Sequence, residues 1–412
     1  MESVSTMVRR LARFDVLALT AAIWFLAKLL RYAFPPLFGA FQTSYGVSNA
    51  TLGTAFTGFM LVYAAMQFPS GVLADRLGSV AVVTAGAAIA ATAALTLIID
   101  APFLVLVAAM LVMGAGTGTH KTVSVRLLSR AYPARTGRAL GVFDTVGTFS
   151  GVVAPTAVVT VAGLSFAFGE SWRLIFLLAG VVGLTLAVLF RVRVPKRVPT
   201  EATADGAASG FDAIDIGTYA RLFRDRRFST FALLTILFSF TYNGLVAFVP
   251  LYLTDAAGFA DATAGVLYSA FFLASLVQLG TGELSDRLGR LPIIAGLLAV
   301  ATAALIAFIS LTGTAGPILL GGTLVAVGVG SHGFRPVRGA YLMTVIPDDV
   351  AGGGLGVVRT MLMGAGALAP AIVGTVSELA GFRPAFWLLA ASVTGATVLA
   401  VFLLVTDHRS DR

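Results

Sequence analysis

Long apolar stretches, separated by short polar ones, run along almost the whole chain. A helix needs about 20 apolar residues to cross the hydrocarbon of a bilayer. Such segments must be helical or form a closed barrel, because lipid offers no partner to backbone N–H and C=O groups. They are too long and too uniformly apolar for the alternating pattern of barrel strands. The pattern therefore predicts twelve transmembrane helices, over residues 14–38, 51–75, 79–99, 102–126, 138–162, 172–191, 228–253, 262–285, 291–311, 316–342, 353–376 and 384–406.

Two of these predictions depend on how an apolar run is divided. The uncharged run Leu291–Ser331 is too long for one span, and Thr312–Pro317 is its natural break because Gly and Pro punctuate helices. The first run follows basic residues, as the apolar part of a secretory signal would. It contains Lys28 and Arg31 and ends only at Pro35-Pro36, so we interpret it as the first transmembrane helix.

Basic residues gather in alternate loops, and this bias sets the orientation of a membrane protein. They lie before the first helix, between helices four and five and helices six and seven, after helix eight and at the end of the chain: Arg9, Arg10, Arg13, Arg130, Arg135, Arg191, Arg193, Lys196, Arg197, Arg221, Arg224, Arg226, Arg227, Arg287, Arg290, Arg409 and Arg412. The opposite loops carry only Arg173 and Arg383, beside several acids. We expect both termini on the cytoplasmic side of the plasma membrane, which requires an even number of helices.

The only long polar segment, residues 192–227, divides the chain into two halves. Its Pro, Thr, Ala and Gly content is typical of a flexible linker. Residues 214–226 could form a short basic helix on the membrane surface. The predicted domains are a six-helix bundle over residues 1–191, a cytoplasmic linker over 192–227 and a second six-helix bundle over 228–412.

Composition agrees with a membrane protein. Hydrophobic residues make up 58% of the chain and charged residues 12%, against roughly 25% charged residues in a soluble domain. The net charge of +8 fits basic loops better than nucleic-acid binding, because no sustained basic face is present. The absence of cysteine excludes disulfides and thiol catalysis.

The two halves resemble each other in sequence. Gly71–Gly78 (GVLADRLG) closes helix two and Gly282–Gly289 (GELSDRLG) closes helix eight, at an offset of 211 between Asp75 and Asp286. Further markers recur in the same order at offsets of 212 to 215: His120 and His332, Arg126 and Arg338, Gly151 and Gly366, Ala154-Pro155 and Ala369-Pro370. Helices six and twelve begin with Trp172-Arg173 and Phe382-Arg383. The order and near-constant offset indicate a parallel duplication of six helices.

The repeated G-x-L-x-D-R-x-G loop resembles the signature of the major facilitator superfamily, and the resemblance extends over about the whole chain. It implies two six-helix bundles that rock around a central site lined by helices one, four, seven and ten. The chain departs from the usual pattern after Gly78, where Ser79–Val82 supplies no basic residue. We therefore expect a less heavily ion-paired gate in the first half.

Ionisable side chains at membrane depth are costly and indicate function. Six basic residues and two hydrogen-bonding residues are candidates for substrate binding: Lys28, Arg31, His120, Lys121, Tyr242, Asn243, His332 and Arg335. Acids at this depth are scarce, with Asp144 and Glu283 near helix ends. A basic cavity of this kind favours an anion, since Arg offers a planar fork to carboxylate or phosphate. The alternative is that the basic side chains reach out to the membrane interfaces.

The helix-one Arg31 followed by Pro35 is also loosely similar to the organic-anion and organophosphate branches of the superfamily. The function that we predict is secondary transport of a small organic carboxylate or phosphate ester, by proton symport or exchange. The main alternative is a proton-coupled drug efflux antiporter, either of the fosmidomycin type, which His120 resembles, or of the multidrug type. Against the multidrug type, Leu111–Gly114 lacks the arginine expected in helix four. A transporter-like sensor is the third class.

A cytoplasmic gate is the second prediction from the charges. The fold implied by the resemblance places helix two opposite helix eleven and helix five opposite helix eight. Opposite charges would then meet as Asp75 with Arg359, and as Asp144 with Arg287 or Arg290. The remaining gate residues are the signature residues Arg76 and Asp286.

The sequence offers no sign of enzymatic activity or of a cofactor. The three histidines have no metal-binding spacing, and no G-x-x-x-x-G-K-[ST] loop for ATP is present. Energy for transport must then come from an ion or substrate gradient. If protons are coupled, His120, His332 and Asp144 are the candidates. We expect a monomer in the lipid bilayer, with a small molecule as its ligand and no nucleic acid.

Overall fold

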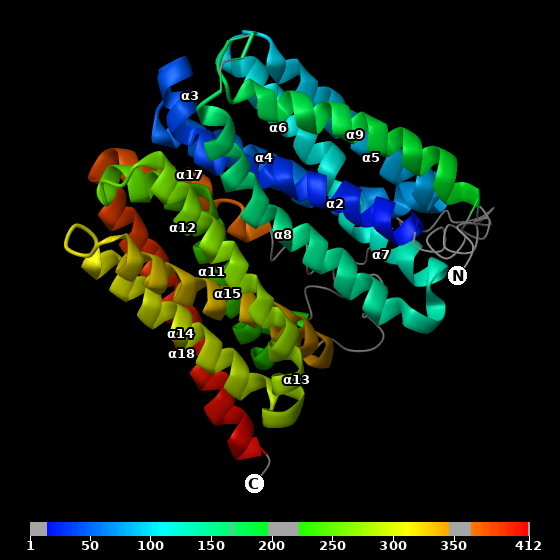
Figure 1. Cartoon of the computed structure of the whole chain (residues 1–412). Helices are drawn as coiled ribbons and strands as arrows, with labels where there is room; N and C mark the ends of the chain where they lie inside the picture. Colours follow the sequence, from blue (N-terminus) through cyan, green and yellow to red (C-terminus); the bar gives the residue numbers. More distant parts are fainter. Residues whose placement is uncertain (1–14, 165, 168, 197–221, 346–363, 411–412) are drawn as a thin grey trace, which may run out of the picture. The chain divides into compact units, whose positions relative to one another are not determined.

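The structure, a computed structural model, describes residues 15–164, 166–167, 169–196, 222–345 and 364–410 (Figure 1). In the first half the helices are α2 (Asp15–Ala33), η2 (Pro35–Leu37), α3 (Phe38–Tyr45), α4 (Asn49–Leu77), α5 (Ser79–Leu95), η3 (Thr96–Ile98), α6 (Phe103–Gly118), α7 (His120–Ala131), η4 (Pro133–Arg135), α8 (Thr136–Ala162), α9 (Arg173–Arg193) and η5 (Val194–Lys196). In the second half they are α11 (Arg226–Leu251), η6 (Tyr252–Ala256), α12 (Asp261–Leu273), η7 (Ala274–Val277), α13 (Gln278–Leu288), α14 (Arg290–Leu311), α15 (Pro317–Val345), α17 (Ala369–Ala380) and α18 (Phe382–Ser410).

The predicted class, an all-α membrane protein, is confirmed. Within the described residues, eleven helices are long and apolar enough to cross a membrane, and Gly364–Ala380 is a shorter apolar helix. Each of the twelve predicted spans corresponds to one of them, with ends that differ by a few residues. The start of the eleventh predicted span and most of the predicted surface helix over 214–226 lie outside the described residues.

The first helix is longer than the sequence predicted. Pro35 does not end it, because Pro35–Leu37 forms a 3-10 turn and α3 continues to Tyr45. A proline at the first positions of a helical turn is tolerated, since the N–H that it lacks would have no partner there. The left-handed Gly46, at φ 64°, closes α3.

The described chain forms two compact units. The first comprises residues 1–33 and 58–214, and the second comprises residues 34–57 and 215–412. In the first unit α2 lies along α8 and α9, and α5 packs against α6 and α9 (Figure 1). In the second unit α14 packs against α15 and α18, and α11 packs against α18. The units follow the two halves of the sequence, except for the segment of residues 34–57.

This segment belongs to the second unit because the start of α4 and α17 are joined by two hydrogen bonds. In each bond a side chain of one helix accepts from a backbone N–H of the other. The Glu378 carboxylate accepts a hydrogen bond of 3.0 Å from the Ala50 amide, in the first turn of α4. The Thr57 hydroxyl accepts one of 3.0 Å from the Ala371 amide, in the first turn of α17. Each helix thus satisfies an orphan N–H of the other helix's N-terminus. Phe38 adds a T-shaped contact to Phe248 of α11, at 5.5 Å between ring centroids.

The repeated loop signature has the same backbone geometry in both units. Its last glycine, Gly78 or Gly289, precedes α5 or α14 with φ/ψ of 83°/147° and 91°/147° respectively. L-residues with a side chain rarely adopt such a positive φ, so this position requires glycine. The match confirms that the two signature loops, 211 residues apart, are copies of one structural device.

Candidate functional site

Helix α2 carries a basic and aromatic face in the first unit. Trp24, Lys28 and Tyr32 are spaced by four residues, so they lie above one another on the helix. Lys28 is 8% exposed and Arg31 is 9% exposed. Both lie in the first predicted membrane span, and the structure buries both among helices.

The first turn of α2 is anchored to Tyr132, a residue between two membrane spans. The Leu17 amide donates a hydrogen bond of 3.2 Å to the hydroxyl of Tyr132, which links α7 to α8. Burial raises the pKa of the Tyr132 phenol, so its hydroxyl stays neutral at physiological pH. This contact fixes where α2 starts against the α7–α8 corner.

The indole of Trp24 is the centre of this face. The Nζ atoms of Lys28 and Lys121 lie 5.3 and 5.5 Å from its ring centroid, from α2 and α7 respectively. Phe143 of α8 stacks on it at 5.5 Å between centroids. A Cβ atom on Gly147 would lie 2.2 Å from the indole Nε1, so only glycine leaves room for this ring. Trp24 therefore brings two lysines from different helices to one surface, where cation–π attraction offsets part of their desolvation.

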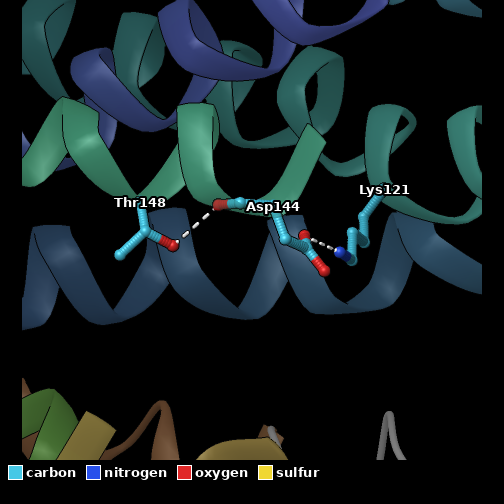
Figure 2. Close-up of polar contacts among 3 residues, drawn as sticks. All are labelled: Lys121, Asp144 and Thr148. Carbon is cyan, nitrogen blue, oxygen red and sulfur yellow. Dashed lines mark hydrogen bonds and ion pairs between the residues drawn. The ribbon is translucent and has the colours of Figure 1, made fainter. Parts of the chain in front are cut away.

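Lys121 also forms an ion pair with Asp144 of α8 (Figure 2). The Lys121 side chain is 13% exposed and the Asp144 side chain is 56% exposed. The Lys121 Nζ lies 5.0 Å from the ring centroid of Phe143, which precedes Asp144 in the chain. One turn further along α8, the Thr148 hydroxyl donates to the Asp144 carbonyl oxygen at 2.9 Å (Figure 2).

Arg31 lies one helical turn beyond Lys28, in an aromatic environment. Its Cζ is 5.7 Å from the ring centroids of Tyr32 and Tyr63. We call Trp24, Lys28, Arg31, Tyr32, Tyr63, Lys121, Phe143 and Asp144 the first-unit cluster. Its four charged side chains carry three positive charges and one negative charge.

His120 is close to Lys121 in sequence but faces another helix. Its Nδ1 lies 3.3 Å from the Thr119 hydroxyl, and its ring packs near Gly86 of α5. The side chain is 1% exposed. These contacts give His120 a packing role between α7 and α5.

The second unit has an aromatic cluster around His332 of α15. The His332 ring is fully buried, and its centroid lies 5.6 Å from Tyr242, 5.2 Å from Phe271 and 5.8 Å from Phe272. The Arg335 Cζ lies 5.5 Å from the Tyr242 ring. Three predicted residues are thus brought together here, and we call this group the second-unit cluster. Asn243 is also buried, at 8% exposure.

The predicted gate residues have described partners within their own units. Asp75 pairs with Arg126, and Asp144 with Lys121 as above. Arg287 pairs with Glu283 one turn earlier. Arg290 donates to the Ala340 carbonyl oxygen at 3.2 Å. Arg76 and Asp286 are exposed, and Arg359 lies outside the described residues, so the pairing across the halves stays a prediction.

The sequence matches a family model described as the Major Facilitator Superfamily over residues 20–334. That match covers most of the chain and both copies of the loop signature. The chain belongs to the Major Facilitator Superfamily. It is therefore a multi-pass membrane transporter rather than an enzyme, as the sequence predicted.

Relatives of the chain are named as transporters of organic acids and as a multidrug resistance protein. The chain is 25% identical to "Probable sulfoacetate transporter SauU" of Cupriavidus necator, with 94% of this chain and 93% of the relative covered. It is 25% identical to a hexuronate transporter of Bacillus subtilis, with 88% of each covered. It is 27% identical to a multidrug resistance protein B homolog of Mycobacterium tuberculosis, with 79% and 64% covered.

A solved structure supports the fold. The bacterial homolog of the human lysosomal transporter Spinster, in an inward-facing and occupied conformation, aligns with a TM-score of 0.76 at 16% identity. The alignment covers 95% of this chain and 96% of that one. At this identity the likeness concerns the superfamily fold alone.

Sequence reasoning found the cations of the first-unit cluster but not its aromatic residues. Trp24 and Tyr32 could have been found, because they lie four residues before and after Lys28 on one helix face. Tyr63 and Phe143 come from other helices, and only tertiary packing brings them to this face. The same holds for Phe271 and Phe272 around His332.

Proposed function

We propose that this superfamily member is a secondary transporter of a small organic anion, and that the first-unit cluster binds the anion. The observation that carries the proposal is the convergence of Lys28, Arg31 and Lys121 on buried aromatic rings with one carboxylate among them. A charged side chain at the centre of a bilayer costs about 3 kcal/mol on insertion scales. Three cations at membrane depth are best explained by an anion that spends part of the transport cycle beside them.

The chemistry of the cluster fits a carboxylate, sulfonate or phosphate group. The Arg31 guanidinium can donate two parallel hydrogen bonds to any of these groups. The lysine ammonium groups add point charges. The buried aromatic rings lower the local dielectric constant, which strengthens such contacts. Sulfoacetate and hexuronate, after which two relatives are named, are both organic anions and agree with this chemistry.

Drug efflux is the second candidate function, since a relative is named as a multidrug resistance protein B homolog. Many exported drugs are cations, and a cationic drug would need acids in the cavity. Among the acids of the described first unit, Asp75 and Asp100 pair with Arg126 and Arg173 away from the cluster. The balance of charge in the cluster therefore favours the organic anion.

The proposal includes an orientation and a transport cycle. The loop charges favour both termini on the cytoplasmic side of the plasma membrane. Alternating access would bring the site to each side in turn, with the predicted pairs Asp75–Arg359 and Asp144–Arg287 or Asp144–Arg290 closing the cytoplasmic side. The driving gradient of the proposed cycle is either that of protons, in symport, or that of a second solute, in exchange.

Counterflow in proteoliposomes tests the proposal. Vesicles loaded with unlabelled sulfoacetate or glucuronate should accumulate the labelled form of the same anion, and protein-free vesicles should not. Ethidium should be neither carried nor a competitor. Counterflow of ethidium, with none of either anion, would support the drug carrier and contradict the proposal.

A further inference from the structure

The ion pair between Lys121 and Asp144 places an anion of the protein's own where the proposed substrate would bind. Lys121 is the cation that α7 contributes to the first-unit cluster, and it shares the Trp24 ring with Lys28. Its ammonium is in contact with the Asp144 carboxylate (Figure 2). An external carboxylate that binds to Lys121 must displace Asp144 or share the ammonium with it.

Asp144 lies deeper in its helix than the sequence predicted, which placed it near a helix end. It follows the first residue of α8, Thr136, by eight positions, which corresponds to about 12 Å along the helix at about 1.5 Å per residue. Lys121 precedes the end of α7 at Ala131 by ten positions, about 15 Å. Just over half of the Asp144 side chain is exposed. A carboxylate facing lipid would be costly at this depth, so its exposed side fits a water-accessible path.

The charged groups around Asp144 are mostly basic. Four elements pack on α8, namely α2, α7, η4 and α9, and all of them carry basic residues. Together with Arg138 of α8 itself, these residues are Lys28, Arg31, His120, Lys121, Arg126, Arg130, Arg135, Arg173, Arg191 and Arg193. Acids on these elements lie elsewhere: Asp15 is in the first turn of α2. Within the described first-unit cluster, Asp144 is thus the carboxylate that can exchange a proton.

We propose that Asp144 is the proton-carrying residue of this transporter, and that it and the substrate anion alternate on Lys121. The inference rests on the proposed anion transport and adds the coupling ion and its binding residue. It differs from the gate prediction, in which Asp144 pairs with Arg287 or Arg290, because here its partner is within the binding cluster.

The exchange balances in protons and charges. When the anion enters, two negative groups compete for one ammonium, and their repulsion favours protonation of one of them. The Asp144 carboxylate takes one proton from water, and an oxygen of the anion replaces it on the Lys121 ammonium, which keeps its own protons. When the anion leaves on the other side, Asp144 releases its proton to water and forms the ion pair again. One proton therefore moves with each anion, in the same direction.

The coupling has a reciprocal consequence that can be measured. If anion binding favours proton uptake, then lower pH strengthens anion binding by the same factor. Asp144→Asn removes both the proton carrier and the competing anion. It should therefore bind sulfoacetate about 5–10-fold more tightly than the wild type at pH 7.5, the lower end of typical coupling, and its binding should no longer change with pH.

The test compares two transport modes of the same variant in proteoliposomes. In wild-type vesicles an inward proton gradient should drive the accumulation of labelled sulfoacetate above equilibrium. The protons that enter with it should acidify the vesicle interior, which trapped pyranine reports. Asp144→Asn should lose both gradient-driven accumulation and acidification, while labelled sulfoacetate still exchanges with unlabelled sulfoacetate at equal pH, at a rate altered by the tighter binding. Thr148→Val, one turn away, and Asp100→Asn, which removes a carboxylate paired with Arg173 at 2.6 Å, should behave as the wild type does.

Several outcomes would overturn the proposal. One is gradient-driven accumulation that persists in Asp144→Asn, and another is loss of sulfoacetate binding in a folded sample of that variant. Calorimetry of the wild type in buffers of different ionisation enthalpy needs no variant: it should show about one proton taken up per sulfoacetate bound, and no uptake would contradict the coupling. Wild-type protein that carries neither sulfoacetate nor glucuronate would instead refute the proposed function.

Discussion

At the scale of single residues, the candidate site depends on the position of one indole. The ammonium groups of Lys28 and Lys121 both lie near the Trp24 ring, and Phe143 stacks on it. The sequence predicted the cations because charge at membrane depth is visible in a hydropathy pattern. It could not predict which rings surround them, since an aromatic residue in an apolar helix looks like any other core residue.

Gly147→Ala tests whether the Trp24 position matters for binding. A methyl group there would lie 2.2 Å from two indole atoms, so the ring must shift from the position in which it contacts both lysines. Displacing one cation–π contact of about 0.5–2 kcal/mol should raise the KM for sulfoacetate about twofold to thirtyfold. The maximal rate should change less. Gly141→Ala on the same helix is the control, because its methyl group would meet no atom within 4 Å; equal KM values for the two variants would refute this role of Trp24.

At the scale of helices and loops, the sequence predicted nearly every element, and the exceptions have local causes. Hydropathy identifies a span because lipid imposes the same requirement on every helix. It does not predict the α3 extension, where Pro35 starts a new turn instead of ending the helix. The repeated loop signature was visible as sequence identity, but its reason became clear only from the positive φ of Gly78 and Gly289.

The glycines of the signature should differ in their tolerance of alanine. Gly78→Ala and Gly289→Ala force a side chain into a backbone conformation that costs about 1–3 kcal/mol, so each should lower the thermal unfolding temperature of purified protein. Gly71→Ala and Gly282→Ala, at the other end of each signature, meet no atom within 4 Å and have no positive φ. They should leave the unfolding temperature unchanged or raise it. The same loss of stability in all four variants would show that φ is not the cause.

At the scale of the whole molecule, transport requires contacts that form and break. The hydrogen bonds between the start of α4 and α17 join a first-half helix to a second-half helix inside the second unit. From chain order alone, residues 34–57 belong to the first half. Chain order could not predict their contacts with the second half, because these depend on the conformation. In an alternating-access cycle these bonds should open each time the molecule changes state.

Cross-linking tests that movement in a chain without natural cysteines. Ala50→Cys with Glu378→Cys replaces a contact of 3.0 Å, and a disulfide or short cross-linker there should stop counterflow until it is reduced. The control pair is Thr302→Cys with Thr397→Cys, whose hydroxyls lie 2.8 Å apart between α14 and α18. Its cross-link lies within the second half and should leave transport intact. Unchanged counterflow through the cross-linked 50–378 pair would show that this contact stays closed throughout the cycle.

The most direct test of the account concerns Arg31, the arginine of the proposed anion site. Arg31→Gln keeps a polar side chain but removes the charge and the paired donors, and charged hydrogen bonds of this kind contribute about 1.5–3 kcal/mol. We expect sulfoacetate counterflow to be lost, while the thermal unfolding temperature stays close to that of the wild type. Arg193→Gln, an exposed arginine at the end of α9, should transport normally. Normal sulfoacetate counterflow by Arg31→Gln would show that the Arg31 side chain reaches out to the membrane interface and does not bind the substrate. That result would contradict the assignment of an anion site to the first-unit cluster.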